Sequence, residues 1–111
     1  MKTLKHKICD VDDIDEGKSR SFKVGETSLF VVRQNSEFFA YENACPHLGV
    51  ELEWSENEFL NPGGDLIQCN LHGALFTIEE GHCISGPCAG QQLTTIAIEQ
   101  QGQALFVTLK K

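Results

Sequence analysis

Apolar and polar residues alternate with a period of two in several short segments of this chain, and no segment sustains a helical period for long. Residues 20–24 and 93–99 are the clearest examples. A period of two places successive side chains on opposite faces of a β-strand. The nearest approach to a helical pattern, residues 50–59, is rich in charge and leads into the turn-forming residues 61–64. The sequence therefore predicts an all-β protein.

Turn-forming residues separate these segments and arrange them as hairpins. Gly25 precedes the third expected strand, residues 34–36 follow it, and Gly102 lies between the last two. We expect a small antiparallel sandwich or partly open barrel, in which residues 43–90 form a loop-rich insert. The expected strands are residues 4–9, 20–24, 28–33, 37–42, 93–99 and 104–109.

The charge balance limits the partners that such a chain can bind. Nine basic and sixteen acidic residues in a chain of 111 give a formal net charge of -7. This argues against sequence-independent binding to nucleic acid and against docking on anionic membranes, because both depend on Lys and Arg. A basic protein is the natural complement to an acidic surface.

The cysteine content points to metal rather than to disulfide bonds. The N-terminal residues carry positive charge without an apolar run behind them, and nowhere do 18 apolar residues follow one another, so we expect a soluble cytoplasmic protein. The cytosol keeps thiols reduced, and five cysteines is an odd number. Clustered Cys and His residues in that compartment usually bind metal.

Two short motifs in the middle of the chain each supply one Cys and one His. Cys45 and His47 form a C-x-H pair, and Cys69 and His72 form a C-x-x-H pair. Two metal groups fit four such ligands: a tetrahedral zinc ion, or a [2Fe–2S] cluster with two thiolates on one iron and two imidazoles on the other. The mixed pairs favour the cluster, because structural zinc sites usually take two ligands of one kind from each loop.

These motifs resemble those of the Rieske ferredoxins and Rieske domains. The resemblance rests on residues 45–49 and 69–73 and extends over nearly the whole chain. It implies a single Rieske domain, residues 1–111, with a cluster-binding part at about residues 43–90. Other residues that match the family are residues 8–14, residues 37–40, Phe76, Gly81, Gly86 and Pro87. The implied iron ligands are Cys45 and Cys69 on one iron, and His47 and His72 on the other.

The resemblance also implies a function. Stand-alone Rieske proteins of this size carry electrons from a flavin reductase to the terminal oxygenase of an aromatic-ring dioxygenase, so we expect a monomeric one-electron carrier with no catalytic residues. Two alternatives remain. One is the small Rieske subunit of a complex such as an assimilatory nitrite reductase, which would purify with a large subunit. The other is a zinc-stabilised β module that binds a protein partner, which the bound metal would identify.

Departures from the family concern the surroundings of the cluster. Residues 50–68 lengthen the connection between the ligand pairs and contain five acidic residues and no Lys or Arg. The acidic stretch at residues 51–58 has two interpretations: it is solvated surface, as charge runs commonly are, or it forms part of a docking face for a basic redox partner. Val50 and Leu71 stand where the Rieske proteins of cytochrome complexes have an extra Cys in each ligand loop. The family's disulfide therefore cannot form.

Two positions near the second ligand pair bear on the reduction potential. High-potential Rieske proteins have a Ser and a Tyr where this chain has Ala74 and Phe76. Hydroxyl donors at these positions stabilise the reduced cluster, and neither residue supplies one. Together with the negative net charge, this predicts a potential toward the lower end of the roughly −150 to +300 mV Rieske range.

Residues outside the motifs are interpreted as structural. Cys9 lies in an alternating segment and is predicted to be a small buried hydrophobic residue. A disulfide between Cys83 and Cys88 is conceivable, but reduced thiols are expected in the cytosol. Neither His6 nor His82 is expected to bind iron. Core or surface positions in a hairpin are predicted for Phe38, Phe39 and Tyr41.

Overall fold

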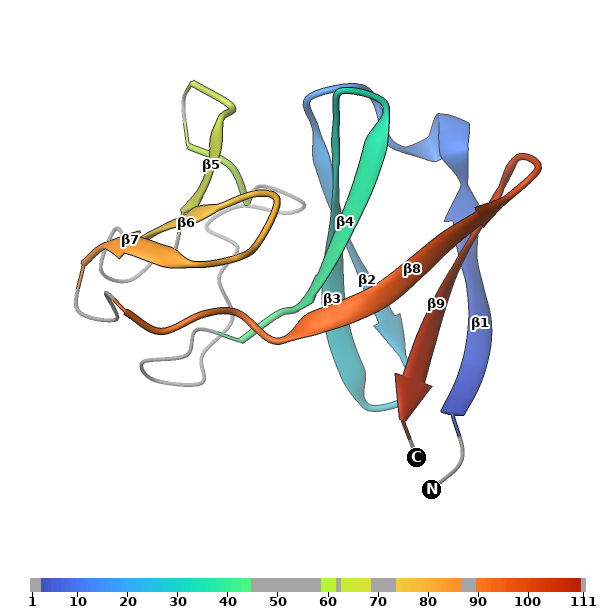
Figure 1. The fold of residues 1–111 in the computed structure, drawn as a ribbon. Helices are drawn as coiled ribbons and strands as arrows, with labels where there is room; N and C mark the ends of the chain where they lie inside the picture. Colours follow the sequence, from blue (N-terminus) through green and yellow to red (C-terminus); the bar gives the residue numbers. More distant parts are fainter. Residues whose placement is uncertain (1–2, 45–58, 62, 69–73, 87–89, 111) are drawn as a thin grey trace.

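The computed structural model describes residues 3–44, 59–61, 63–68, 74–86 and 90–110. The larger of two antiparallel sheets contains β1 (Thr3–Asp10), β2 (Ser19–Val24), β3 (Thr27–Gln34), β4 (Glu37–Glu42), β8 (Thr95–Gln101) and β9 (Ala104–Lys110). The strand order is β1-β9-β8-β4-β3-β2 (Figure 1). Its edge strands β1 and β2 come into contact, so this sheet is a nearly closed barrel. The predicted all-β, barrel-like fold is confirmed.

A second, smaller sheet lies beside the barrel (Figure 1). It contains β5 (Leu66–Gln68), β6 (Leu75–Thr77) and β7 (Cys83–Ser85), paired in that order. The sequence predicted only a loop-rich insert here, because strands of three residues are too short to show an alternating pattern. The expected strand at residues 93–99 begins at Thr95 in the structure. Leu93 precedes it and donates its backbone N–H to the carbonyl of Gly81 in the small-sheet region, at 2.9 Å.

The β3–β4 hairpin shows how the turns of the barrel are built. Asn35 and Ser36 connect the strands with φ angles of 54° and 64°. Two consecutive left-handed residues match the right-handed twist of the flanking strands. The carboxylate of Glu16 accepts the backbone N–H groups of both residues, at 2.6 and 2.8 Å. The turn predicted at residues 34–36 is therefore confirmed, and a distant carboxylate helps to stabilise it.

Strand β3 packs on both of its faces, since all four residues Leu29–Val32 are buried. Leu29 and Val31 face the interior of the barrel, whereas Phe30 and Val32 face the small sheet. The barrel core is made of Cys9, Val11, Ile14, Leu29, Val31, Ala40, Ile96, Leu105 and Val107. The joint core, between the barrel and the small sheet, is made of Phe30, Val32, Tyr41, Phe59, Leu60, Ile67, Ala74, Phe76, Ile78, Cys83 and Leu93.

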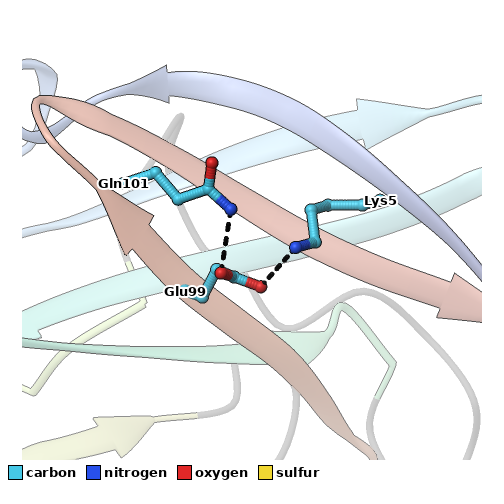
Figure 2. A network of polar contacts seen from close by, with 3 residues as sticks. All are labelled: Lys5, Glu99 and Gln101. Atoms are coloured by element: carbon cyan, nitrogen blue, oxygen red, sulfur yellow. Dashed lines mark hydrogen bonds and ion pairs between the residues drawn. The ribbon is translucent and has the colours of Figure 1, made fainter.

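Polar contacts on the barrel surface connect strands that are not hydrogen-bonded neighbours. Lys5 on β1 forms an ion pair with Glu99 on β8, across the intervening β9, at 2.7 Å between Nζ and Oε1 (Figure 2). Gln101 donates its side-chain amide to the other carboxylate oxygen of Glu99 at 2.9 Å.

The structure also confirms that Cys9 is buried. In the described part of the chain, no helix is long and apolar enough to cross a membrane.

Candidate metal centre

The predicted ligands Cys45, His47, Cys69 and His72 lie outside the described residues, as do residues 50–58 and Cys88. Among the residues that the structure does describe, no three His, Cys, Asp or Glu side chains gather closely enough to hold a metal ion. The structure describes instead the residues that enter the first motif and those that enter and leave the second. Residues 45–49 are hereafter called the first ligand segment, and residues 69–73 the second ligand segment.

The chain that enters the first ligand segment is fixed to the barrel by backbone hydrogen bonds. Glu42, the last residue of β4, donates its N–H to the carbonyl of Thr94 at 2.9 Å. Asn43 donates its N–H to the carbonyl of Ser28 at 2.9 Å, and its side-chain amide lies 3.3 Å from the Ser28 hydroxyl. The side chain of Asn43 is buried as well. The first ligand segment therefore starts from a rigid strand end.

The second ligand segment connects β5 to β6, which pair with each other through Gln68 and Leu75. Gln68 also donates its N–H to the carbonyl of Phe59 at 2.8 Å. Phe59 in turn donates its own N–H to the Ser19 hydroxyl oxygen at 3.2 Å, and its ring stacks on Phe30 with centroids 4.3 Å apart. These contacts fix the entrance of the second segment to the barrel strands β2 and β3.

Gly86 packs against the exit of the second ligand segment. It has a φ of +105°, and a Cβ built there would lie 2.8 Å from the Cα of Ala74. Ala74 directly follows the second ligand segment and is almost completely buried. Only glycine combines this backbone angle with so close an approach. The sequence matched Gly86 to the family, and the structure supplies the physical reason for a glycine.

The surroundings of the second segment are apolar. Residues 66–78 contain no charged side chain, and Ile67, Ala74 and Phe76 are all buried. Ala74 and Phe76 thus bring no hydroxyl to this side of the site, as the sequence indicated. The Cys83 thiol lies in the same joint core and donates to the Ser85 carbonyl at 3.3 Å.

Sequence reasoning missed the role of one residue, Tyr41. It was interpreted only as part of a hairpin, yet its hydroxyl donates to the carbonyl of Ile78 at 2.5 Å, from the barrel to the small sheet. Burial, with the carboxylates of Glu80 and Glu79 adding to it, raises the pKa of Tyr41 to about 12, so the hydroxyl stays protonated at neutral pH. A tyrosine in a buried strand position was the available signal, because a buried O–H needs a partner.

The chain fits a cluster with mixed ligands. Two thiols and two imidazoles are the donors that a Rieske cluster takes. The entrance of the first ligand segment is held by backbone hydrogen bonds, and the entrance and exit of the second by backbone hydrogen bonds and apolar packing. Rigid elements that carry ligand loops are what a preorganised metal site requires.

Residues 5–104 match the family of the Rieske [2Fe-2S] domain. The protein belongs to this family, and its cofactor is a Rieske-type [2Fe–2S] cluster, which supplies one-electron chemistry.

Relatives of similar length are ferredoxin components. The ferredoxin component of biphenyl 2,3-dioxygenase from Rhodococcus jostii is 30% identical over 105 residues, which are 94% of this chain and 92% of that protein. The ferredoxin component of the alkene monooxygenase system of Xanthobacter autotrophicus is 36% identical over 78 residues, 70% of this chain, and the match spans 61% of that protein's length.

A solved structure agrees with these relatives. It is a complex of reduced oxygenase and oxidized ferredoxin in carbazole 1,9a-dioxygenase, and one of its chains superposes with a TM-score of 0.77 at 29% identity. The match covers 97% of this chain and 96% of that chain. The protein is thus an electron carrier of the ferredoxin type and is not itself an enzyme.

Proposed function

We propose that this chain is the ferredoxin component of an aromatic-ring dioxygenase system, in which it takes single electrons from a flavin reductase and delivers them to the terminal oxygenase. The observation that carries the proposal is the match over almost the full length of a biphenyl dioxygenase ferredoxin. The solved complex of a similar chain with its oxygenase supports the identity of the acceptor. We propose that the protein acts as a monomer in the cytoplasm, without nucleic-acid or membrane partners.

The proposal assigns the cluster to four residues of the two ligand segments. Cys45 and Cys69 hold one iron, and His47 and His72 hold the other. Residues 1–111 then form one Rieske domain, whose cluster-binding part at about residues 43–90 contains the three strands of the small sheet. What supports the assignment is the donor chemistry of the motifs and the fixed strand ends that lead into them.

Substitution of the ligands tests this assignment directly. Cys45→Ser and Cys69→Ser should lose the cluster, because a serine hydroxyl is a much weaker iron ligand than a thiolate, and His47→Cys and His72→Cys should convert or lose it. The matched control is His82→Asn, since His82 is exposed on the small-sheet side and lies outside both motifs. Iron content and the visible spectrum are measured. A full cluster in either serine variant, or its loss from the control, contradicts the assignment.

The carrier function is tested by mixing. The dithionite-reduced protein, freed of excess reductant, is mixed with an oxidised Rieske-type terminal oxygenase, and the oxidation of the ferredoxin is followed by its visible absorption. One electron per chain should pass to the oxygenase. Copurification with an obligate large subunit and turnover of nitrite would instead support the nitrite reductase alternative.

A further inference from the structure

Tyr41 connects the two strands that lead to the ligand segments. It lies in β4, four residues before Cys45, and its side chain is 1% exposed. Its hydroxyl donates to the carbonyl of Ile78, the residue that follows β6. Strand β6 begins two residues after the end of the second ligand segment. One side-chain hydrogen bond therefore joins the strand that enters the first segment to the strand that leaves the second.

The turn after β6 closes around the tyrosine ring. Gly81, with a φ of +72°, donates its N–H to the carbonyl of Thr77 at 2.8 Å. A Cβ at Gly81 would lie 2.8 Å from Cε1 of Tyr41 and 3.3 Å from Cβ of Leu93. On its other side the ring packs against Phe30, with centroids 5.8 Å apart. The ring is thus held between the barrel and the turn, and its hydroxyl has one defined direction.

A second connection runs parallel to the tyrosine and consists of backbone alone. The N–H of Leu93 donates to the carbonyl of Gly81, and the carbonyl of the next residue, Thr94, accepts the N–H of Glu42, each at 2.9 Å. Neither bond involves the side chain at position 41. Removal of the hydroxyl therefore tests the side-chain connection while the backbone connection remains.

We propose that Tyr41 is a positioning residue for the [2Fe–2S] cluster: its hydroxyl holds the turn at residues 77–81, and with it the second ligand segment, in fixed relation to the first. The proposal rests on the proposed function, because it takes the ligands from the two segments. Each iron receives one ligand from each segment, so the relative placement of the segments determines the geometry at both irons. A phenylalanine would fill the same space but leave the Ile78 carbonyl unsatisfied.

The test compares Tyr41→Phe with Val107→Ala, a variant that weakens the fold at a distance from Tyr41. Val107→Ala removes side-chain volume from the barrel core, which Tyr41 does not join. Each variant is measured at the same number of degrees below its own unfolding midpoint, so that a difference in global stability does not enter the comparison. We expect Tyr41→Phe to lose its cluster to a chelator about tenfold faster than Val107→Ala. The reduced-state EPR lines of Tyr41→Phe should broaden, because a looser pair of segments permits a wider range of iron geometries. Val107→Ala should keep the wild-type line width.

A second pair of variants moves the ring without removing the hydroxyl. Gly81→Ala places a methyl group against Tyr41, whereas Gly102→Ala creates similar backbone strain, at a φ of +62°, with nothing within 4 Å. Gly81→Ala should broaden the EPR lines, and Gly102→Ala should not.

If Tyr41→Phe keeps the wild-type cluster lifetime and line width, the positioning role is wrong and the carrier function stands. If the wild-type protein shows no mixed-ligand cluster, both proposals are wrong.

Discussion

Gly86 packs closely against the backbone of Ala74, the residue that follows the second ligand segment. Its backbone approaches Ala74 so closely that a Cβ would lie 2.8 Å from the Cα and 3.0 Å from the Cβ of that residue. The obstacle is backbone and a short side chain, so neither can rotate away. A side chain at position 86 would have to push the exit of the second ligand segment out of place.

We therefore predict that Gly86→Ala is strongly destabilising and lowers cluster occupancy. The left-handed backbone costs about 1 kcal/mol or more for alanine, and overpacking adds about 1–3 kcal/mol. Gly90→Ala is the control, since Gly90 has a similar φ of +93° with nothing within 4 Å. Urea unfolding and iron content measure both effects. Equal losses in the two variants would show that the contact with Ala74 is unimportant.

The Cys9 thiol makes stability depend on pH in the alkaline range. Burial, followed by the nearby carboxylate of Asp13, raises the pKa of Cys9 from 9.0 to about 11. The folded protein then holds this proton more tightly than the unfolded chain. The stabilisation is complete below pH 9 and is lost as pH rises toward 11, by on the order of 1 kcal/mol per pH unit.

Cys9→Ala should remove this dependence. The free energies of unfolding of the two proteins are compared at about pH 8 and about pH 10.5, and their difference should shift in favour of the variant at the higher pH. Other titrating groups, including Tyr41, are common to both proteins and cancel. A difference that stays constant with pH would contradict the assignment of this titration to Cys9.

At the scale of elements, the ion pair of Lys5 and Glu99 joins the edge strand β1 to β8 (Figure 2). The hydrogen bond from Lys5, with a smaller contribution from Gln101, lowers the pKa of Glu99. A carboxyl group whose pKa is lower in the folded protein than in the unfolded chain stabilises the fold at pH values above its pKa in the unfolded chain. This stabilisation disappears as the pH falls through its pKa in the folded protein. Since both side chains are about half exposed, we expect a small effect that salt screens.

Glu99→Gln should lower the urea midpoint slightly at neutral pH and low salt. The difference from wild type should vanish at about 1 M salt, and also at acid pH once Glu99 is protonated in the folded as well as the unfolded state. Glu37→Gln is the control, because it removes an exposed carboxylate of β4 that has no ion pair in the described part of the chain. A loss in Glu99→Gln that persists at high salt would indicate a packing effect instead.

The elements that could be predicted from sequence are those with a readable local pattern. The expected strand at residues 37–42 coincides with β4, because an apolar and aromatic run at residues 38–41 follows the turn at residues 34–36. Strands β5, β6 and β7 have three residues each and show no period. The partner of Tyr41 lies 37 positions away along the chain, and no local pattern encodes such a distance. The four ligands remain a prediction from their motifs.

At the scale of the whole molecule, the net charge of -7 affects the rate at which the carrier associates with its redox partners. Charged residues steer association when the partner carries the opposite sign. We expect electron transfer to the oxygenase to slow as ionic strength rises from about 0.01 to about 0.5 M, because the Debye length shrinks from about 30 to a few ångströms. Stopped-flow rates measure this, and a rate that does not change with salt would exclude electrostatic docking.

The central claim is that Cys45, His47, Cys69 and His72 hold one Rieske-type cluster. The most direct test is the visible spectrum and the low-temperature EPR spectrum of the purified protein before and after reduction with dithionite. The account predicts a red-brown protein whose reduced signal has an average g value below that of all-cysteine clusters. A colourless protein with stoichiometric zinc, or a reduced signal of the all-cysteine type, would contradict it.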